Sequence, residues 1–167
     1  EAINNPLRLL AGWFMVGPAS FPPASLLLSY WMVGCYFMAL KRYAELRAIG
    51  DRDRAAAYRR SFGHYTEERL LVSVMFYATA AMMLFGTFIM RYRVELVLAF
   101  PFVAWVMASY LALALEPESK VQRPEELYRA PGLMLALVVC TAVSSLLLFV
   151  DLRWLHALLA PWGPASW

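Results

Sequence analysis

Residues 70–90 read LLVSVMFYATAAMMLFGTFIM, which is 21 residues without a formal charge. As an α-helix this stretch would be roughly 30 Å long, which is about the thickness of the hydrocarbon core of a bilayer. Two further charge-free runs of 20 residues each follow at 96–115 and 131–150. A single run of this kind would also suit a buried helix of a soluble protein. Three of them indicate an integral membrane protein.

The composition points the same way, because 62% of the 167 residues are hydrophobic and 16% are charged. Soluble domains carry about 25% charged residues. The sequence predicts one all-α transmembrane domain over residues 1–167, with about five transmembrane helices. Pro101 lies inside the fourth of them and is expected to kink it. The predicted spans cover residues 5–17, 25–48, 70–90, 96–115 and 131–150.

The segment between the second and third spans is polar and basic. Tyr58, Phe62 and Tyr65 recur at i, i+4 and i+7, which places three aromatic side chains on one helix face. Arg59 and His64 fall off that face. The pattern predicts an amphipathic helix over about residues 53–66 that lies in the membrane interface.

Five crossings divide the basic residues very unevenly between the two sides of the membrane. Arg8, the eight basic residues of 41–69 and the three of 116–130 share one side, and only three lie on the other. By the positive-inside rule, residues 41–69 are cytoplasmic, and the chain is expected in an inner or plasma membrane. Attraction to anionic membrane lipids, at about 1 kcal/mol per arginine, would be enough to explain the basic segment.

The motif KRYAEL, residues 41–46, ends the second predicted span. Lys41 and Glu45 are four residues apart, so one interpretation is an intrahelical ion pair, although the favourable order places Glu before Lys. Snorkelling of Lys41 and Arg42 to the membrane surface is another. A third interpretation is a polar cluster at the mouth of a helix bundle. There Lys41 and Arg42 would bind phosphate oxygens and Glu45 would hold a divalent cation.

Several other classes of site are not indicated by the sequence. It contains no G-x-G-x-x-G, no P-loop, no His-x-x-x-His and no Glu-x-x-His motif. His64 and His156 are isolated and are expected to be structural or interfacial. Cys35 and Cys140 lie in separate apolar runs and are interpreted as small packing residues. We expect no nucleic-acid partner.

Four stretches of the chain resemble the later half of the UbiA superfamily of membrane prenyltransferases. The resemblance is strongest to the branch that includes decaprenyl-phosphate phosphoribosyltransferases, in which a helix ending in KRYAEL stands where other members carry a second aspartate-rich motif. It covers about residues 6–150. The four stretches are PLRLLAGW at 6–13, YWMVGCYFMALKRYAELR at 30–47, YRRSFGHYTEERLL at 58–71 and PFVAWVMASYLALALEPESKVQRPEELY at 101–128.

The resemblance implies a fold, a substrate class and a cofactor. Family members are bundles of nine transmembrane helices, and this chain resembles the last five. Two cytoplasmic polar motifs hold a Mg²⁺-bound phosphate or pyrophosphate above a groove for an isoprenoid lipid. Lys41 and Arg42 would then bind the substrate phosphate, and Glu45 would be a Mg²⁺ ligand. Further phosphate contacts are expected from Arg8, Arg59 and Tyr65, with Tyr43 as an additional candidate.

The chain also departs from the family pattern. The first family motif, of the Asn-Asp-x-x-Asp type, is absent, and the sequence contains neither an Asn-Asp dipeptide nor an Asp-x-x-x-Asp motif. An N-terminal half, a partner subunit or self-association of the chain would have to supply that half of the metal site. The expected function is therefore part of a Mg²⁺-dependent membrane transferase that acts on a polyprenyl phosphate or pyrophosphate. The alternative is a non-catalytic, degenerate half-transferase that serves as a structural subunit of a larger membrane complex.

Overall fold

The computed structural model describes residues 3–17, 20–117, 119–122 and 124–159. This part of the chain is helical, and it contains no β-strand. Four helices are long and apolar enough to cross a membrane, and they coincide with four predicted spans to within three residues at either end. They are α2 (Ala24–Ile49), α4 (Glu67–Tyr92), η2 with α5 (Val94–Ala99 and Phe100–Leu115) and α6 (Pro131–Phe149).

The first predicted span is a shorter element. Helix α1 covers Asn4–Val16, which is 13 residues. Its length of about 20 Å is less than the hydrocarbon thickness of about 30 Å. The described part of the chain therefore has four helices of spanning length where the sequence predicts about five.

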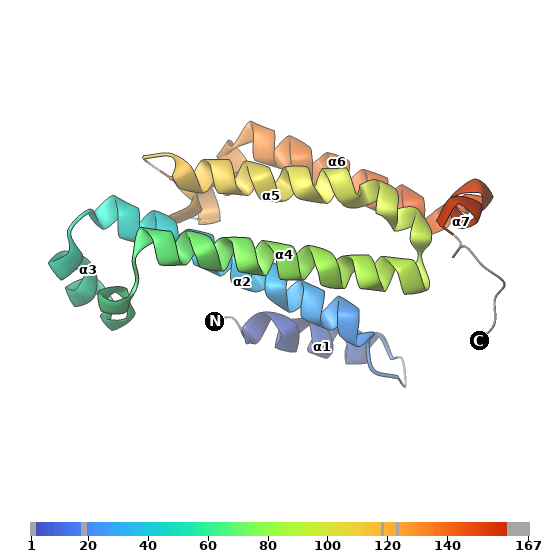
Figure 1. The fold of residues 1–167 in the computed structure, drawn as a ribbon, viewed down its shortest axis with the longest axis horizontal. Helices are drawn as coiled ribbons and strands as arrows, with labels where there is room; N and C mark the ends of the chain where they lie inside the picture. Colours follow the sequence, from blue (N-terminus) through green and yellow to red (C-terminus); the bar gives the residue numbers. More distant parts are fainter. Residues whose placement is uncertain (1–2, 18–19, 118, 123, 160–167) are drawn as a thin grey trace.

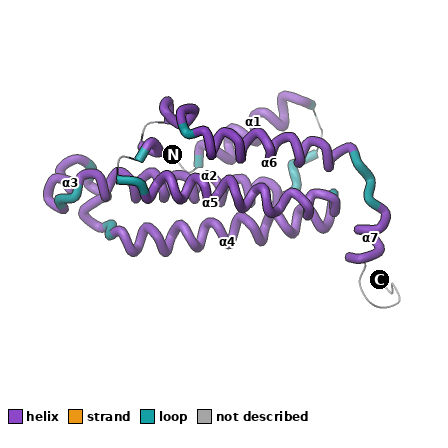
Figure 2. The backbone as a smooth tube through the Cα atoms, turned by 90° about the horizontal axis from the view of Figure 1, so that it is seen from above, coloured by secondary structure: helices purple, strands orange, loops and turns teal. Residues whose placement is uncertain are grey.

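The long helices pair in two layers. Helices α2 and α4 run antiparallel and make the most extensive packing in the molecule, and α5 packs against α6. Figure 1 shows the α5–α6 pair lying along the α2–α4 pair, with α1 against the outer side of α2. Figure 2 shows α3 at one end of the bundle and α7 at the other. The remaining short elements are α3 (Arg52–Tyr58), η1 (Arg60–His64), η3 (Lys120–Gln122), η4 (Pro124–Arg129) and α7 (Arg153–Leu159).

The termini of the helices follow from local chemistry. Gly50 ends α2 in the left-handed region, with φ 66°, and its N–H donates to the Leu46 carbonyl at 3.3 Å. Glycine adopts this conformation without a Cβ clash. Thr66 begins α4, because its hydroxyl accepts a hydrogen bond from the Arg69 N–H at 3.3 Å. The polar segment from Gly50 to Thr66 is thereby set off from the spans on both sides.

Pro101 does not kink the interior of a helix, as the sequence had suggested. The span begins with the 3₁₀ segment η2, and Pro101 lies in the first turn of the α-helix that follows. Proline is well tolerated there because the N–H that it lacks has no partner within the helix.

Residues 53–66 do not form the single interfacial helix that the aromatic spacing predicts. Arg59 is extended, with φ −149° and ψ 119°, and it separates α3 from η1. Phe62 is fully buried, and its ring centroid lies 6.4 Å from that of Tyr58 and 6.3 Å from that of Tyr65. The three aromatic residues therefore cluster on each other, with Phe62 in the centre.

The core is apolar, with a few buried hydrogen bonds between helices. The Tyr36 hydroxyl donates to the Met107 carbonyl at 2.7 Å, and the Ser29 hydroxyl donates to the Ala81 carbonyl at 3.1 Å. These bonds link α2 to α5 and to α4, and they satisfy hydroxyl groups that have no access to water at this depth. The largest cluster of buried residues comprises Tyr36, Ala39, Leu40, Val74, Met107, Ala114 and Val121.

We predict that Gly34→Ala weakens the packing of α1 on α2. A Cβ at Gly34 would overlap the side-chain amide of Asn5 on α1. Overpacking of this kind costs about 1–3 kcal/mol, so the apparent Tm in detergent should fall. Gly86→Ala is the matched control, because a Cβ there meets nothing within 4 Å. Equal melting temperatures for the two variants would contradict this packing.

Candidate functional site

The KRYAEL motif lies in the last third of α2, at the end of the bundle that carries α3 and η1 (Figure 1). Arg42 Nη1 donates to Glu45 Oε2 at 2.6 Å, and the two side chains are only 11% and 14% exposed. Glu45 is thus paired with Arg42 at i,i+3, whereas the sequence pattern suggested Lys41 at i,i+4. Lys41 itself is half-buried on the same helix.

Arg42 also lines a cavity of about 220 Å³ between α2 and α4. The wall is mostly apolar, and its polar atoms come from Arg42, Ser73 and two tyrosines. A guanidinium has five N–H donors in a planar fork, a geometry that matches phosphate oxygens as well as carboxylate oxygens. The lining residues are Cys35, Met38, Ala39, Arg42, Tyr65, Leu70, Ser73 and Tyr77.

A second cavity, of about 370 Å³, lies on the Glu45 side of the ion pair. Its lining is also mainly apolar, and it includes the polar side chains of Arg54, Tyr58 and Gln122 beside Glu45. Gln122 is fixed by a hydrogen bond from its Nε2 to the Ala44 carbonyl at 3.2 Å, which ties η3 to α2. The Arg42–Glu45 pair therefore contributes one residue to each of two neighbouring cavities.

Of the other predicted phosphate contacts, one lies beside Arg42 and two do not. Tyr65 lines the same cavity as Arg42. The Tyr43 hydroxyl is buried and accepts a hydrogen bond from Arg47 Nη1 at 3.2 Å. The guanidinium carbon of Arg59 lies 6.0 Å from the centroid of the Phe62 ring. The structure joins Arg42, Glu45 and Tyr65, and it gives Tyr43 and Arg59 other neighbours.

Arg8 lies away from this cluster. It is exposed on α1, and α1 runs antiparallel to α2 (Figure 1) with Asn5 against Gly34. Gly34 is seven residues before Lys41, and Arg8 is three residues beyond Asn5 in the opposite direction. At 1.5 Å per residue, Arg8 and Lys41 are separated by about 15 Å along the bundle. The two side chains therefore approach the membrane at different depths.

A Mg²⁺ ion prefers octahedral oxygen ligands, including carboxylates. The Glu45 carboxylate is engaged by Arg42, and this pairing opposes the binding of a cation at the same oxygen. Among the described residues, the one group of three potential His, Cys or carboxylate metal ligands lies elsewhere, at the opposite end of the bundle. The described residues around Glu45 do not by themselves fit a Mg²⁺ site, and further carboxylates would have to come from outside them.

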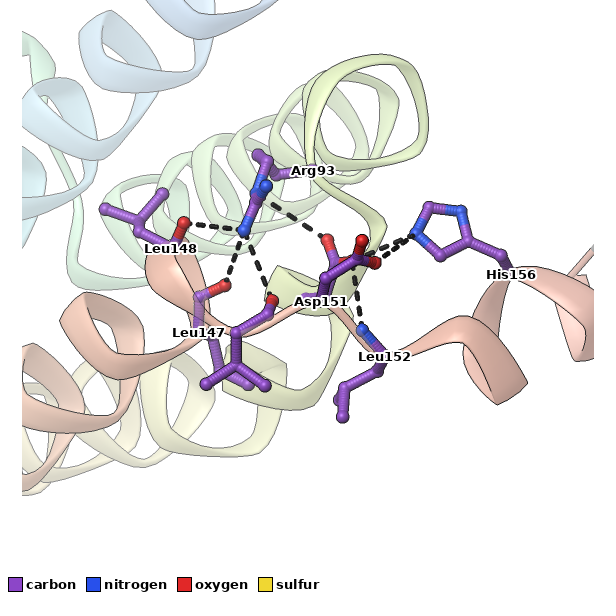
Figure 3. A network of polar contacts seen from close by, with 8 residues as sticks. Arg93, Leu147, Leu148, Asp151, Leu152 and His156 are labelled. Carbon is purple, nitrogen blue, oxygen red and sulfur yellow. Dashed lines mark hydrogen bonds and ion pairs between the residues drawn. The ribbon is translucent and has the colours of Figure 1, made fainter.

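The opposite end of the bundle holds a polar network that the sequence did not indicate. Arg93 follows α4, and its Nη2 donates to the carbonyls of Leu147, at 3.3 Å, and of Leu148 and Val150 (Figure 3). These carbonyls belong to the C-terminal end of α6, where carbonyl groups have no partner within the helix. Arg93 therefore caps α6 from another helix.

Glu95 is the centre of this network, and its side chain is only 2% exposed. Its Oε1 accepts from the Leu152 N–H at 3.4 Å and lies 2.9 Å from His156 Nε2, and its Oε2 lies 3.6 Å from Arg93 Nε. A carboxylate at the start of a transmembrane span is costly unless it is paired. The position of Glu95 in the sequence was therefore a signal that this residue has a partner. His156 could not be assigned as its partner from spacing, because 61 residues separate the two.

Comparison with family models, with curated proteins and with solved structures finds no match to this chain. The resemblance to the UbiA superfamily remains a prediction from the quoted sequence stretches. The functional argument therefore depends on the geometry of the two ends of the bundle.

We predict that Arg93→Met lowers the apparent Tm of the purified protein by several degrees. The substitution removes the cap on α6 and leaves the buried Glu95 without its cationic neighbour, and unpaired buried charges are strongly destabilising. Arg91→Met is the matched control, because Arg91 is exposed on the same helix end and lies over the Tyr92 ring, 5.8 Å from its centroid. A similar loss in both variants would show that the Arg93 contacts do not stabilise the fold.

Proposed function

We propose that this chain binds the phosphate end of a polyprenyl phosphate or pyrophosphate and forms part of a UbiA-like, Mg²⁺-dependent membrane transferase. The observation that supports this most directly is the position of Arg42, which is largely buried and lines a mainly apolar cavity between two membrane helices. A lipid with an anionic head needs this combination of a cation and an adjoining apolar wall.

In this proposal, each side chain has a distinct part. Arg42 donates to the phosphate oxygens, and Glu45 holds the guanidinium in place through the 2.6 Å bond. The first isoprene units lie against Met38, Ala39 and Tyr77 of the same cavity. The cavity beyond Glu45, with Arg54 and Gln122 in its wall, accommodates the second reactant, which would meet the lipid phosphate at the ion pair.

Mg²⁺, when bound, would neutralise the charge that develops on the phosphate or pyrophosphate during displacement. We propose that Glu45 contributes one carboxylate to the Mg²⁺ site. Because the described residues do not complete that site, a further segment or a partner subunit would supply the other carboxylates. Lys41, beside Arg42, is placed to strengthen the local positive potential that attracts the lipid phosphate.

We propose that the chain lies in an inner or plasma membrane, with the basic end of the bundle on the cytoplasmic side. Residues 41–69 and η4 lie at one end, whereas Arg91, Arg93 and Arg153 lie at the other (Figure 1). An orientation with the larger number of basic residues inside follows the positive-inside rule. Exposed arginines of the segment, such as Arg54 and Arg60, would then lie near anionic membrane lipids.

A second proposal is a non-catalytic half-transferase that serves as a structural subunit of a larger membrane complex. It is favoured by the surroundings of Glu45, which is paired with Arg42. The three-ligand metal cluster of the described residues lies at the other end of the bundle. Under this proposal the Arg42–Glu45 pair would be a contact within α2 without catalytic consequence. The two proposals differ in whether the chain binds a lipid phosphate.

We predict that Arg42→Ala weakens the binding of a polyprenyl phosphate by about 10- to 100-fold, because hydrogen bonds to charged groups contribute about 1.5–3 kcal/mol. Binding is measured by isothermal titration in detergent, with the corresponding polyprenol, which lacks phosphate, as the control ligand. Arg60→Ala is the control variant, because Arg60 is exposed in η1 and not part of the cavity lining. The structural-subunit proposal predicts no phosphate-dependent binding in any variant.

We predict that Glu45→Gln retains phosphate-dependent binding of the lipid and abolishes its strengthening by Mg²⁺. The amide keeps the shape of the side chain and can still accept a hydrogen bond from Arg42, but it no longer carries the charge that a Mg²⁺ ligand needs. The titration is repeated with and without MgCl₂ on the complex that contains the missing carboxylates. Mg²⁺ dependence that is unchanged in Glu45→Gln would exclude Glu45 as a metal ligand.

A further inference from the structure

The end of the bundle opposite to Arg42 brings together three side chains of the types that bind transition metals. Glu95 lies in η2, Asp151 follows α6 and His156 lies in α7, so three separate elements contribute one ligand atom each. Figure 3 shows Asp151 and His156 pointing toward each other across this corner of the molecule. The proposed lipid-phosphate function makes no use of this cluster.

The spacing of the ligand atoms fits a small metal ion. His156 Nε2 lies 2.9 Å from Glu95 Oε1 and 3.7 Å from Asp151 Oδ1, and the three ligand atoms all lie within 4.8 Å of one another. Tetrahedral bonds of about 2.0–2.1 Å to zinc place ligand atoms roughly 3.3 Å apart. These two distances lie on either side of that value. The ligand oxygens of Glu95 and Asp151 lie within 4.8 Å of each other, and the exposed Asp151 side chain would adjust its rotamer to complete the arrangement.

The surroundings of Glu95 resemble those of a metal-binding carboxylate. The carboxylate is almost fully buried, and the Leu152 N–H and Arg93 approach it from its protein side. Arg93 lies nearest to Oε2, whereas Oε1 faces His156. The guanidinium is in turn fixed by three carbonyls of the α6 end. The Leu152 N–H donates to the same Oε1 that faces His156, at 3.4 Å. It orients the carboxylate and leaves the second lone pair of Oε1 for the ion.

The other side of the cluster is open to solvent. The side chains of Asp151 and His156 are 73% and 55% exposed. An ion can therefore arrive from water, and both side chains can adjust their rotamers around the fixed Glu95. A buried, oriented ligand together with two adjustable exposed ligands distinguishes this corner from an ordinary group of surface acids.

We propose that Glu95, Asp151 and His156 form a binding site for Zn²⁺ or a closely similar divalent transition metal. One imidazole nitrogen with two carboxylate oxygens suits zinc, whereas Mg²⁺ and Ca²⁺ take oxygen ligands. Three protein ligands leave the fourth tetrahedral position to water. His156 binds through its Nε2 lone pair, so the ion replaces the contact between His156 and Glu95. The bound ion links α7 to the beginning of the α5 span.

The test is direct measurement of zinc binding to the full chain, purified in detergent without a polyhistidine tag. The probe is ZnSO₄, titrated by calorimetry, with the absorption of Co²⁺ in the same site as a second readout. We expect one ion per chain and a rise in Tm with ZnSO₄, because a ligand of the native state stabilises it. His156→Gln and Asp151→Asn should each weaken binding at least about tenfold.

The control is His64→Gln, which removes the other histidine of the chain, at the opposite end of the bundle. It should bind Zn²⁺ as the unmodified chain does. Asp151 is exposed, so Asp151→Asn tests the site without disturbing the buried Glu95. The proposal is overturned if the unmodified chain binds no Zn²⁺, if both site variants bind it equally well, or if His64→Gln is the variant that loses it.

Discussion

The bilayer excludes unpaired charge, and this constraint accounts for the distribution of chemistry in the molecule. The four spanning helices carry apolar side chains over most of their length, and the charged residues gather at the two ends of the bundle. Among the described residues, Glu45 at one end and Glu95 at the other are largely buried carboxylates, and each has an arginine beside it. Leaving one partner of such a pair alone costs far more than the pair contributes to stability. Both pairs therefore fix local structure more than they drive folding.

The two arginine–glutamate pairs differ in what they connect. Arg42 and Glu45 lie on the same turn of α2, and the two side chains line neighbouring cavities. Glu95 and Arg93 instead contact the end of α6 and α7, more than 50 residues away in sequence. This second network joins the end of α6 and helix α7 to the start of the α5 span. Its role in stabilising the fold is compatible with metal binding by the same residues.

The sequence predicted four of its five spans to within three residues, because length and the absence of charge determine them, whereas the first predicted span is the 13-residue helix α1. The details that the sequence did not predict depend on which of several neighbouring groups contact one another in the folded chain. Glu45 had two basic residues within reach, at i−4 and i−3, and only the rotamers in the folded bundle decide in favour of Arg42. Pro101 was expected to kink a helix, but a 3₁₀ segment in front of it moves the start of the α-helix to the proline. The interfacial helix was divided at Arg59 because burying Phe62 between two tyrosines overrides the helical periodicity.

The cluster of Glu95 and His156 shows a different limit. Neither residue belongs to a short motif, and their contact exists because η2 begins, and α6 leads into α7, at the same end of the bundle. The four apolar helices are 19 to 26 residues long, and each is long enough to cross a bilayer. Long helices that run side by side bring together the polar residues that flank them, whatever their separation in sequence. The two ends of the bundle therefore lie roughly 30 Å apart, so a group at one end cannot contact a group at the other.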